Sequence, residues 1–316
     1  MTRDRPRGVD RCSLALGAAQ FGQVYGLANQ VGAVAGPAAR ELVAAAWEGG
    51  IHEFDTAAAY GDSELVLGQA LKTLGLADQA TVITKVKHLD ATELADPAAG
   101  ARAVAASVEQ SLRRLGLERI PVVLFHQDAD ARYLDVLLSL RDRGLIERVG
   151  VSCGHDPAAA VRRVGHGGVQ ALQLPANILD DRHLVGGSFA AARDHGVSVY
   201  VRSVYLQGLL VMPENDIPGY LAGVLPARRA LDRLAGEVGI PSIQLVLRAM
   251  FSLPGAVSLL VGATTAAEVR ANCAAAAAGP LPPDVLALLN AQVPRPAESV
   301  YTPAAWPQLA EARGTP

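Results

Sequence analysis

The sequence predicts a (β/α)8 barrel, in which eight parallel strands close into one cylindrical sheet inside a ring of helices. First, short apolar segments rich in β-branched residues alternate with helical segments eight times along the chain. Second, the short segments lack polar alternation, which is typical of strands buried on both faces. Third, polar residues suited to chemistry follow several of these segments, as at the carboxyl ends of barrel strands. A doubly wound open sheet also has this alternation, but no GxGxxG sequence follows the first strand.

The elements follow one another with recognisable boundaries. Strands are expected, in chain order, at residues 13–17, 51–54, 81–85, 121–126, 147–152, 169–173, 197–202 and 257–261. Helices are expected at residues 37–47, 63–74, 100–115, 132–143, 157–164, 184–195, 226–237, 241–252 and 266–278. Pro37 and Pro157 suit the first turn of a helix, because a first turn leaves its N–H groups unpaired anyway. Gly116, Gly144 and Gly196 indicate where three helices end.

The length of 316 residues exceeds that of most single domains, but α/β barrels of this length form one domain. We expect residues 13–292 to form the barrel, residues 1–12 a flexible N-terminus, and residues 293–316 a tail that could cover the substrate pocket. The connection 203–225 is also too irregular for the scaffold. Loops of such length usually cover a site or are disordered.

Composition excludes several classes of protein. The net charge of −3 and the 4% aromatic content argue against a nucleic-acid-binding protein, which needs basic and stacking surfaces. No run of about eighteen apolar residues exists, so we expect no membrane span. Cys12, Cys153 and Cys273 lack CxxC spacing, and residues 1–7 do not begin a signal peptide, so we expect reduced thiols in a cytoplasmic protein. No His, Asp and Glu set has metal-ligand spacing, and we expect no metal site.

Four polar side chains follow the ends of three successive strands. Asp55 follows the strand 51–54, Tyr60 comes five residues later, and Lys85 and His126 end the next two strands. Because parallel strands end at one rim of a barrel, these side chains are expected to meet. Together they suit reduction of a carbonyl: a phenol donates the proton, a lysine favours the phenolate, a carboxylate holds the lysine, and an imidazole orients the substrate oxygen.

Each of these residues also has an ordinary structural interpretation. Tyr60 could be a tyrosine on the barrel rim and Asp55 a helix cap. His126 could be a core histidine bonded to a backbone carbonyl. Lys87 lies on the same strand face as Lys85, and spacing alone does not separate the two lysines. The catalytic interpretation depends on the order of the four residues and on their common place at strand ends.

The motifs Asp55-Thr56…Tyr60-Gly61, Thr84-Lys85 and Phe125-His126 resemble the catalytic tetrad of the aldo-keto reductase superfamily. The resemblance covers roughly residues 13–290, and it implies a TIM-barrel oxidoreductase that uses a nicotinamide dinucleotide. It selects Lys85 rather than Lys87 as the catalytic lysine.

The same resemblance implies where the cofactor binds. The segments 150–152 and 170–177 resemble the fifth- and sixth-strand segments that hold the nicotinamide carboxamide, and the segments 203–208 and 262–272 resemble those that hold the pyrophosphate and adenosine. The cofactor-binding residues that it implies are Ser152, Gln173, Arg202, Ser203, Leu206, Gly208, Gly262, Thr264, Glu268 and Asn272.

Two positions depart from common family patterns. Arg202 stands where many members place an aromatic residue against the nicotinamide; a guanidinium plane can also stack there. The segment 262–269 contains no Lys or Arg to pair with a 2′-phosphate, while Glu268 would repel a phosphate and accept a bond from a free 2′-hydroxyl. We therefore expect NAD(H) in preference to NADP(H).

The sequence also resembles a bacterial branch of the superfamily associated with sugar and surface-polysaccharide biosynthesis. Its motifs here are 16–22, 202–208 and Trp306. The expected pocket roof is polar and poor in aromatics: Gln23, Val24, Tyr25, Lys87, His88, Gln127, Asp128, Tyr205, Leu206, Gln207, Tyr301 and Trp306. We therefore expect a small sugar-like carbonyl or polyol as substrate. A cofactor-retaining epimerase or isomerase and a poorly active cofactor-binding regulator remain alternatives, and the sequence leaves oligomeric state, reaction direction and pathway undecided.

Overall fold

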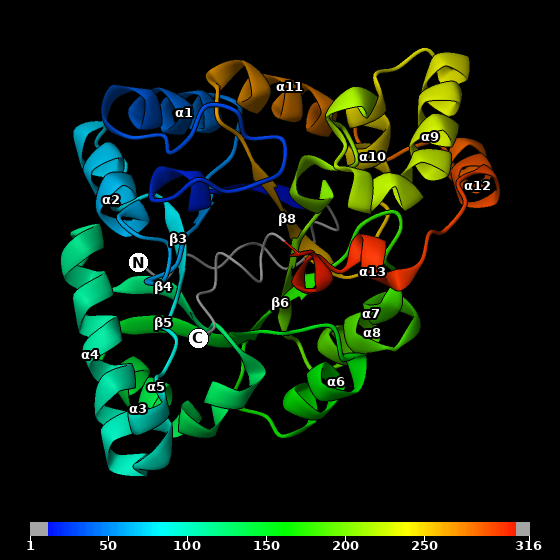
Figure 1. The fold of residues 1–316 in the computed structure, drawn as a ribbon. Coiled ribbons are helices and arrows are strands. Elements are labelled where there is room, and N and C mark those ends of the chain that lie inside the picture. The colour runs from blue at the N-terminus through cyan, green and yellow to red at the C-terminus, as the bar shows by residue number, and fades with distance from the viewer. Residues whose placement is uncertain (1–11, 308–316) are drawn as a thin grey trace.

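The computed structural model describes residues 12–307. Eight parallel strands close into a barrel in sequence order, with the last strand paired to the first (Figure 1). The strands are β1 (Ser13–Gly17), β2 (Glu53–Asp55), β3 (Thr81–Lys85), β4 (Ile120–Phe125), β5 (Ile146–Ser152), β6 (Ala171–Pro175), β7 (Ser198–Arg202) and β8 (Ala256–Gly262). This confirms the predicted (β/α)8 fold. The sixth strand begins two residues later than expected, because its pairing with β5 starts only at Ala171 opposite Gly150.

Helices surround the barrel (Figure 1). Their bounds are α1 (Gly36–Glu48), α2 (Ser63–Thr73), α3 (Ala91–Ala95), α4 (Pro97–Leu115), α5 (Leu134–Asp142), α6 (Pro157–Gly165), α7 (Arg182–Val185), α8 (Ser188–Asp194), α9 (Leu225–Val238), α10 (Ser242–Met250), α11 (Ala266–Ala277), α12 (Pro283–Gln292) and α13 (Glu298–Tyr301). Short 3₁₀ helices are η1 (Ala19–Phe21), η2 (Asp128–Tyr133), η3 (Leu206–Gly208), η4 (Glu214–Asp216), η5 (Gly219–Val224) and η6 (Pro303–Ala305).

The largest differences from the expected elements lie in connections. The single helix expected at 184–195 is broken into α7 and α8 by Gly186 and Gly187, because Gly187 adopts a φ of +80° and Gly186 lies against Pro157, where a Cβ would come within 2.4 Å of the proline Cβ. The helices α3, α12 and α13 were not expected. The connection 203–225 is also more ordered than its composition indicates, since it contains η3, η4 and η5.

The largest apolar core, which includes Leu16, Phe54 and Val123, packs the strands against the surrounding helices, and two smaller apolar regions lie apart from it. Inside the barrel, one small layer is formed by Ala15, Ile83, Val122, Leu124, Ala171, Tyr200 and Leu260. A separate apolar cluster joins the connection after β7 to α9, α10 and the tail, with Leu206 and Trp306 buried in it. This second cluster gives the long connection and the described part of the tail a core of their own, outside the barrel.

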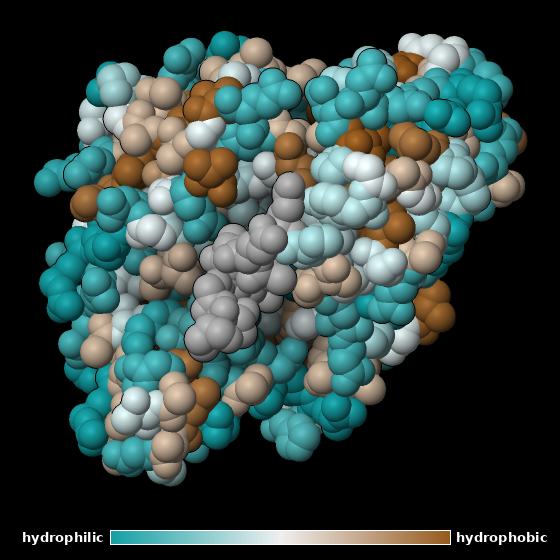
Figure 2. Space-filling view, viewed as in Figure 1, coloured by the Kyte–Doolittle hydropathy of each residue, from teal (hydrophilic) through white to brown (hydrophobic). Residues whose placement is uncertain are grey.

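The surface is mostly hydrophilic on the face that Figure 2 shows, and its hydrophobic residues form separate patches. Within residues 12–307 no helix has the length and apolar character that crossing a membrane requires.

Candidate active site

A buried ion pair lies at the ends of the neighbouring strands β2 and β3. The Lys85 Nζ donates hydrogen bonds to both Asp55 carboxylate oxygens, at 2.9 and 2.8 Å, and to the Thr56 carbonyl oxygen at 2.8 Å. Lys85 is 1% exposed and Asp55 5%. Burial on its own lowers the pKa of Lys85, but the Asp55 carboxylate and the nearby Tyr60 phenol outweigh it, so the pKa of Lys85 is raised and its ammonium persists.

Tyr60 lies against this ion pair. The Lys85 Nζ is 5.0 Å from the centre of the Tyr60 ring. The backbone around Tyr60 is fixed by a close contact between two loops. A Cβ on Gly22 would come within 1.8 Å of the Tyr60 carbonyl oxygen, and a Cβ on Gly61, which has a φ of +53°, would come within 2.4 Å of the Gly22 carbonyl oxygen. Only glycine fits these two positions. The loop after β1 therefore holds the tyrosine over the lysine.

His126 completes the group at the end of β4. Its ring meets the Tyr60 ring edge-on, with 5.6 Å between centroids and an interplanar angle of 83°. On its other side it stacks on His88 at 4.3 Å, and Gln127 bonds the His88 Nδ1 at 2.8 Å. Burial, then the charges of Lys85, His88 and Arg202, lower the pKa of His126 to about 2. The imidazole is therefore neutral at physiological pH and can bond an oxygen without adding charge.

Sequence reasoning placed His88 in the pocket roof but did not predict that it stacks on His126. The two histidines lie on different loops, at the ends of β3 and β4, and no spacing rule relates them.

Ser152 and Gln173 form a hydrogen-bonded chain that ends on Asp55. The Ser152 hydroxyl donates to the Gln173 Oε1 at 3.3 Å, and the Gln173 Nε2 donates to the Asp55 Oδ1 at 2.7 Å. Both residues are buried. The predicted cofactor residues on β5 and β6 are thus joined directly to the predicted catalytic carboxylate on β2.

The chain after β7 is strained. Ser203, Leu206 and Gln207 have positive φ angles of 67°, 49° and 56°. For residues other than glycine such conformations cost about 1–3 kcal/mol each, and they cluster at functional sites. The Gln207 carbonyl oxygen accepts a hydrogen bond from the Leu27 N–H at 2.9 Å, which ties this segment to the loop after β1.

A cavity of about 500 Å³ extends from this group along the loops after β7 and β8. The predicted site residues that line it are Asp55, Tyr60, Gln173, Arg202, Ser203, Gly208, Gly262, Thr264, Glu268 and Asn272. Lys85, His126 and Ser152 are not among its lining residues, although each contacts one that is. Leu206 lies elsewhere, because its side chain is fully buried in the apolar cluster beside the barrel.

At the far end of the cavity, Glu268 belongs to the first turn of α11. Its Oε2 accepts a hydrogen bond from the Thr264 N–H at 2.7 Å, while the Thr265 hydroxyl caps the helix by accepting from the Glu268 N–H at 3.2 Å. The Tyr205 hydroxyl donates to the Asn272 Oδ1 at 2.6 Å. The charged residues among the described lining are Asp55, Arg202, Asp216 and Glu268. The charged lining of the cavity is therefore mainly acidic.

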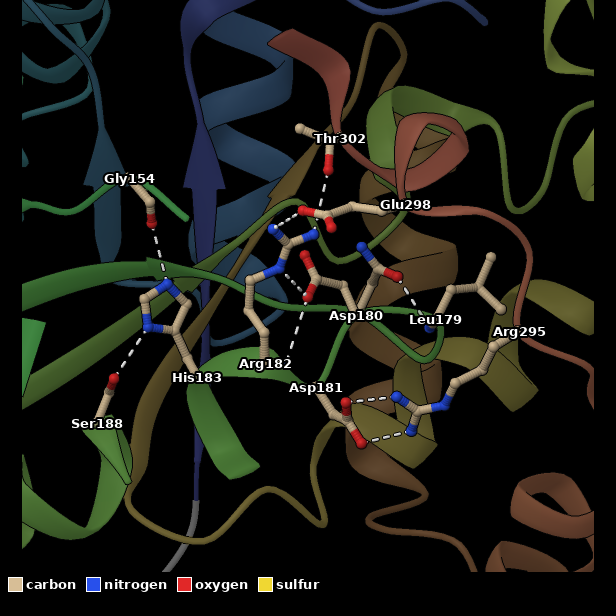
Figure 3. A network of polar contacts seen from close by, with 11 residues as sticks. Gly154, Leu179, Asp180, Asp181, Arg182, His183, Ser188, Arg295, Glu298 and Thr302 are labelled. Carbon is tan, nitrogen blue, oxygen red and sulfur yellow. Dashed lines mark hydrogen bonds and ion pairs between the residues drawn. The ribbon is translucent and has the colours of Figure 1, made fainter. Parts of the chain in front are cut away.

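Arg202 connects the cavity to a second polar network, drawn in Figure 3. Its guanidinium donates to the Cys153 carbonyl oxygen at 3.0 Å. The following residue, Gly154, bonds the fully buried His183 through its carbonyl oxygen at 2.9 Å (Figure 3). Arg182, which precedes His183 in the chain, donates hydrogen bonds to Asp180 and to Glu298 in α13.

The tail packs against α7 through this network. Besides Glu298, the Thr302 hydroxyl oxygen accepts from Arg182, and Arg295 pairs with Asp181 (Figure 3). No residue of the described tail, 293–307, lines the cavity. Trp306 is buried in the apolar cluster, where its Nε1 donates to the Val300 carbonyl oxygen. The remaining tail residues, 308–316, lie outside the described residues.

Metal ligation was not expected, and residues 12–307 contain no group of three or more His, Cys, Asp or Glu arranged to hold a metal ion.

Comparison with known proteins identifies the relatives of this chain. Residues 13–293 match the model of the aldo/keto reductase family. The chain is 30% identical over 257 residues to an aldo-keto reductase of Bacillus subtilis, covering 73% of this chain and 76% of that protein. It is 27% identical over 260 residues to the NADH-specific methylglyoxal reductase of Escherichia coli, covering 72% and 78%. A shorter match, 32% identical over 126 residues, spans 38% of this chain and 42% of an aldo-keto reductase of Mycolicibacterium smegmatis.

Solved structures agree on the fold. The holo form of an aldo-keto reductase from Bacillus halodurans matches with a TM-score of 0.70 at 22% identity, covering 92% of this chain and 95% of that one. A glycerol dehydrogenase from Gluconobacter oxydans matches with a TM-score of 0.68 at 24% identity, covering 93% and 97%.

Proposed function

Because the chain belongs to the aldo/keto reductase family, whose members are generally oxidoreductases, we propose that it transfers a hydride between a nicotinamide dinucleotide and the carbonyl or alcohol carbon of a small, polar, sugar-like substrate. One observation carries this proposal. Tyr60 lies against the buried Lys85–Asp55 ion pair and His126, at the end of a cavity of about 500 Å³. The proton donor Tyr60 and the carboxylate Asp55 therefore line a space that can admit substrate, and Lys85 and His126 each contact Tyr60.

Each side chain has a role in the reduction direction. Tyr60 would donate its proton to the substrate oxygen as the carbonyl is reduced. The Lys85 ammonium, 5.0 Å from the ring centre, stabilises the phenolate that remains. Asp55 holds that ammonium in place through two hydrogen bonds. Neutral His126 orients the oxygen. In the oxidation direction the same groups act in reverse.

The lining of the cavity fits a dinucleotide. Gln173 lines the cavity with a side-chain amide that can recognise a carboxamide by hydrogen bonds, and the Ser152 hydroxyl bonds the oxygen of that amide. At the other end, the twelve-residue helix α11 begins just after Thr264, which lines the cavity. The N-terminus of a helix favours the binding of a phosphate. Arg202, Ser203, Gly208, Gly262 and Asn272 also line the cavity. The nicotinamide would supply or accept the hydride.

We propose NAD(H) as the preferred cofactor. No lysine or arginine except Arg202 is among the described residues that line the cavity, whereas Asp216 and Glu268 are. A 2′-phosphate would meet these carboxylates without a cationic partner, but a free hydroxyl can donate to one of them. The Escherichia coli relative is described as NADH-specific. Tighter binding of NADPH than NADH in a fluorescence titration would refute this preference.

The polar lining supports a small hydroxylated substrate. Tyr25, Asn29, Gln30 and Gln207 line the same cavity and offer hydrogen-bonding groups to hydroxyls. The named activities of two similar proteins, a methylglyoxal reductase and a glycerol dehydrogenase, concern small polar molecules. We expect turnover of short aldoses or polyols. Turnover of flat aromatic aldehydes, with none of these, would exclude the sugar-like substrate class.

The compartment we propose is the cytoplasm. Cys153 and Cys273 are free thiols, a pattern that suits a reducing environment.

The Tyr60→Phe variant tests the central claim. It should lower kcat by roughly a thousandfold, because it removes the proton donor, while leaving the NADH dissociation constant within a few-fold. The matched control is Tyr220→Phe, which removes the same hydroxyl from an exposed tyrosine outside the cavity and should leave both values unchanged. Parallel loss of NADH binding and turnover in Tyr60→Phe would show instead that the tyrosine is structural.

A further inference from the structure

Gln173 contacts two parts of the site at once. Its Oε1 accepts a hydrogen bond from Ser152, and its Nε2 donates to Asp55 at 2.7 Å. We infer that Gln173 is a positioning residue for proton transfer, which sets the charge that Asp55 presents to Lys85, as well as a ligand of the cofactor carboxamide. This inference rests on the proposed hydride transfer and extends it to a residue whose family role concerns the cofactor alone.

The orientation of the Gln173 amide follows from its two neighbours. Asp55 is bonded to the Lys85 ammonium through both oxygens, so its carboxylate can only accept hydrogen bonds, and the atom that faces it must be the amide nitrogen. The Ser152 hydroxyl then donates to the amide oxygen. The chemistry of the neighbours thus fixes which end of the amide points to Asp55.

The hydrogen bond from Gln173 to Asp55 changes the negative charge that acts on Lys85. The Asp55 Oδ1 accepts from both Gln173 and Lys85, and all three residues are almost fully buried. In such surroundings water does not screen the carboxylate charge, so a second hydrogen-bond donor offsets part of that charge. Without that donor, the Asp55 charge would act on Lys85 alone. The ammonium would then be held more strongly by Asp55 and would stabilise the Tyr60 phenolate less.

Gln173 can serve both groups together. A side-chain amide has two N–H donors, of which one is directed at Asp55. The second can reach a bound carboxamide without releasing Asp55. Cofactor and acid–base group are therefore connected through a single side chain.

The test compares Gln173→Met with Ser152→Ala. At saturating cofactor, Gln173→Met should lower kcat for carbonyl reduction roughly tenfold, because it removes a donor to a buried charge. It should also move the alkaline limb of the pH–rate profile to higher pH, since the phenolate is less favoured. Ser152→Ala removes the other hydrogen bond of the same amide and leaves Asp55 untouched. It should weaken NADH binding and leave the midpoint of the alkaline limb where it is in the wild type, because the hydrogen bond from Gln173 to Asp55 remains.

If Gln173→Met changes only the KM for cofactor, as Ser152→Ala does, Gln173 is merely a cofactor ligand and the inference is wrong. Gln173→Leu repeats the comparison should the methionine variant fail to fold. A readout that needs no turnover separates this outcome from failure of the proposed function. Tyrosinate absorbance is followed as the pH is raised, and the part of the signal that is absent in Tyr60→Phe reports the ionisation of Tyr60. The pH at the midpoint of that part should be higher in Gln173→Met. An unchanged midpoint overturns the inference even in a protein that turns over no substrate.

Discussion

Two polar networks in this protein use the same kinds of side chain in different surroundings. One joins Asp55, Lys85 and Gln173 inside the rim of the barrel, where each residue is at most 5% exposed. The other joins α7 to the tail, where the side chain of Arg295 is 54% exposed and that of Glu298 is 68% exposed (Figure 3). Both contain carboxylates bonded to cations at short range.

Burial decides what each network does. Breaking a buried ion pair leaves an uncompensated charge and costs about 3–5 kcal/mol, whereas an exposed pair contributes about 0–1 kcal/mol. The same low dielectric that makes the buried pair costly to break lets Lys85 act strongly on Tyr60. The network near the tail can only hold one surface segment against another. Similar ion pairs therefore tune an acid–base group in the buried network and hold surface segments together in the exposed one.

The largest expected effect comes from Lys85→Met. The variant leaves Asp55 buried without its cation, so we expect the free energy of unfolding to fall by about 3–5 kcal/mol and kcat to fall by at least about a hundredfold. Urea unfolding and steady-state turnover measure the two effects. The control is Lys87→Met, which breaks the more exposed pair between Lys87 and Glu93 and should change both values little. Equal effects of the two substitutions would remove the distinction between the networks.

A second prediction concerns pH and His126. Its folded-state pKa of about 2 lies below the ordinary value of 6.5. Between these two pH values the unfolded chain therefore binds more protons than the folded chain does. The contribution of the neutral ring to stability is complete above pH 6.5 and is lost as the pH falls. Between pH 6.5 and 5 this loss amounts to about 1–2 kcal/mol. The His126→Asn variant should lack that part of the pH dependence, measured by urea unfolding at pH 7 and pH 5.

The Asp181–Arg295 pair of the tail network should not change in that window. Its bond to Arg295, aided by the charge of that arginine, lowers the pKa of Asp181 below 3.8, so the contribution of this pair is present above pH 3.8 and is lost only in stronger acid. Identical slopes for wild type and His126→Asn between pH 7 and 5 would contradict the assignment of the acid sensitivity to His126.

The smallest effect is expected for Arg295→Gln. It removes the ion pair with Asp181, which is partly exposed, so stability should fall by less than about 1 kcal/mol and the difference should shrink in high salt. We expect kcat to stay at the wild-type value, because no described tail residue lines the cavity. Arg119→Gln, which removes a looser surface pair with Glu147, is the control. A large loss of activity in Arg295→Gln alone would show that the tail acts on the site.

Much of the site could be anticipated because it depends on strand order. Asp55, Lys85 and His126 end neighbouring strands, and parallel strands present their ends at one rim, so sequence position nearly fixes their spatial relation. The stacking of His88 on His126 was not anticipated, since it depends on how two loops pack. The break between α7 and α8 was missed although Gly186-Gly187 is a local signal for a turn; only the contact of Gly186 with Pro157 depends on tertiary packing.

The sequence by itself determined the barrel, the order of its strands and the placement of the acid, lysine, histidine and tyrosine, because hydrophobic periodicity and strand ends are local properties of the chain. Only the tertiary structure decided that Gln173 bonds Asp55. The two residues belong to β6 and β2, which are not neighbours in the sheet and face each other only because the barrel closes. Contacts across a closed sheet depend on its curvature and on the length of each side chain, and no pattern along the chain encodes either.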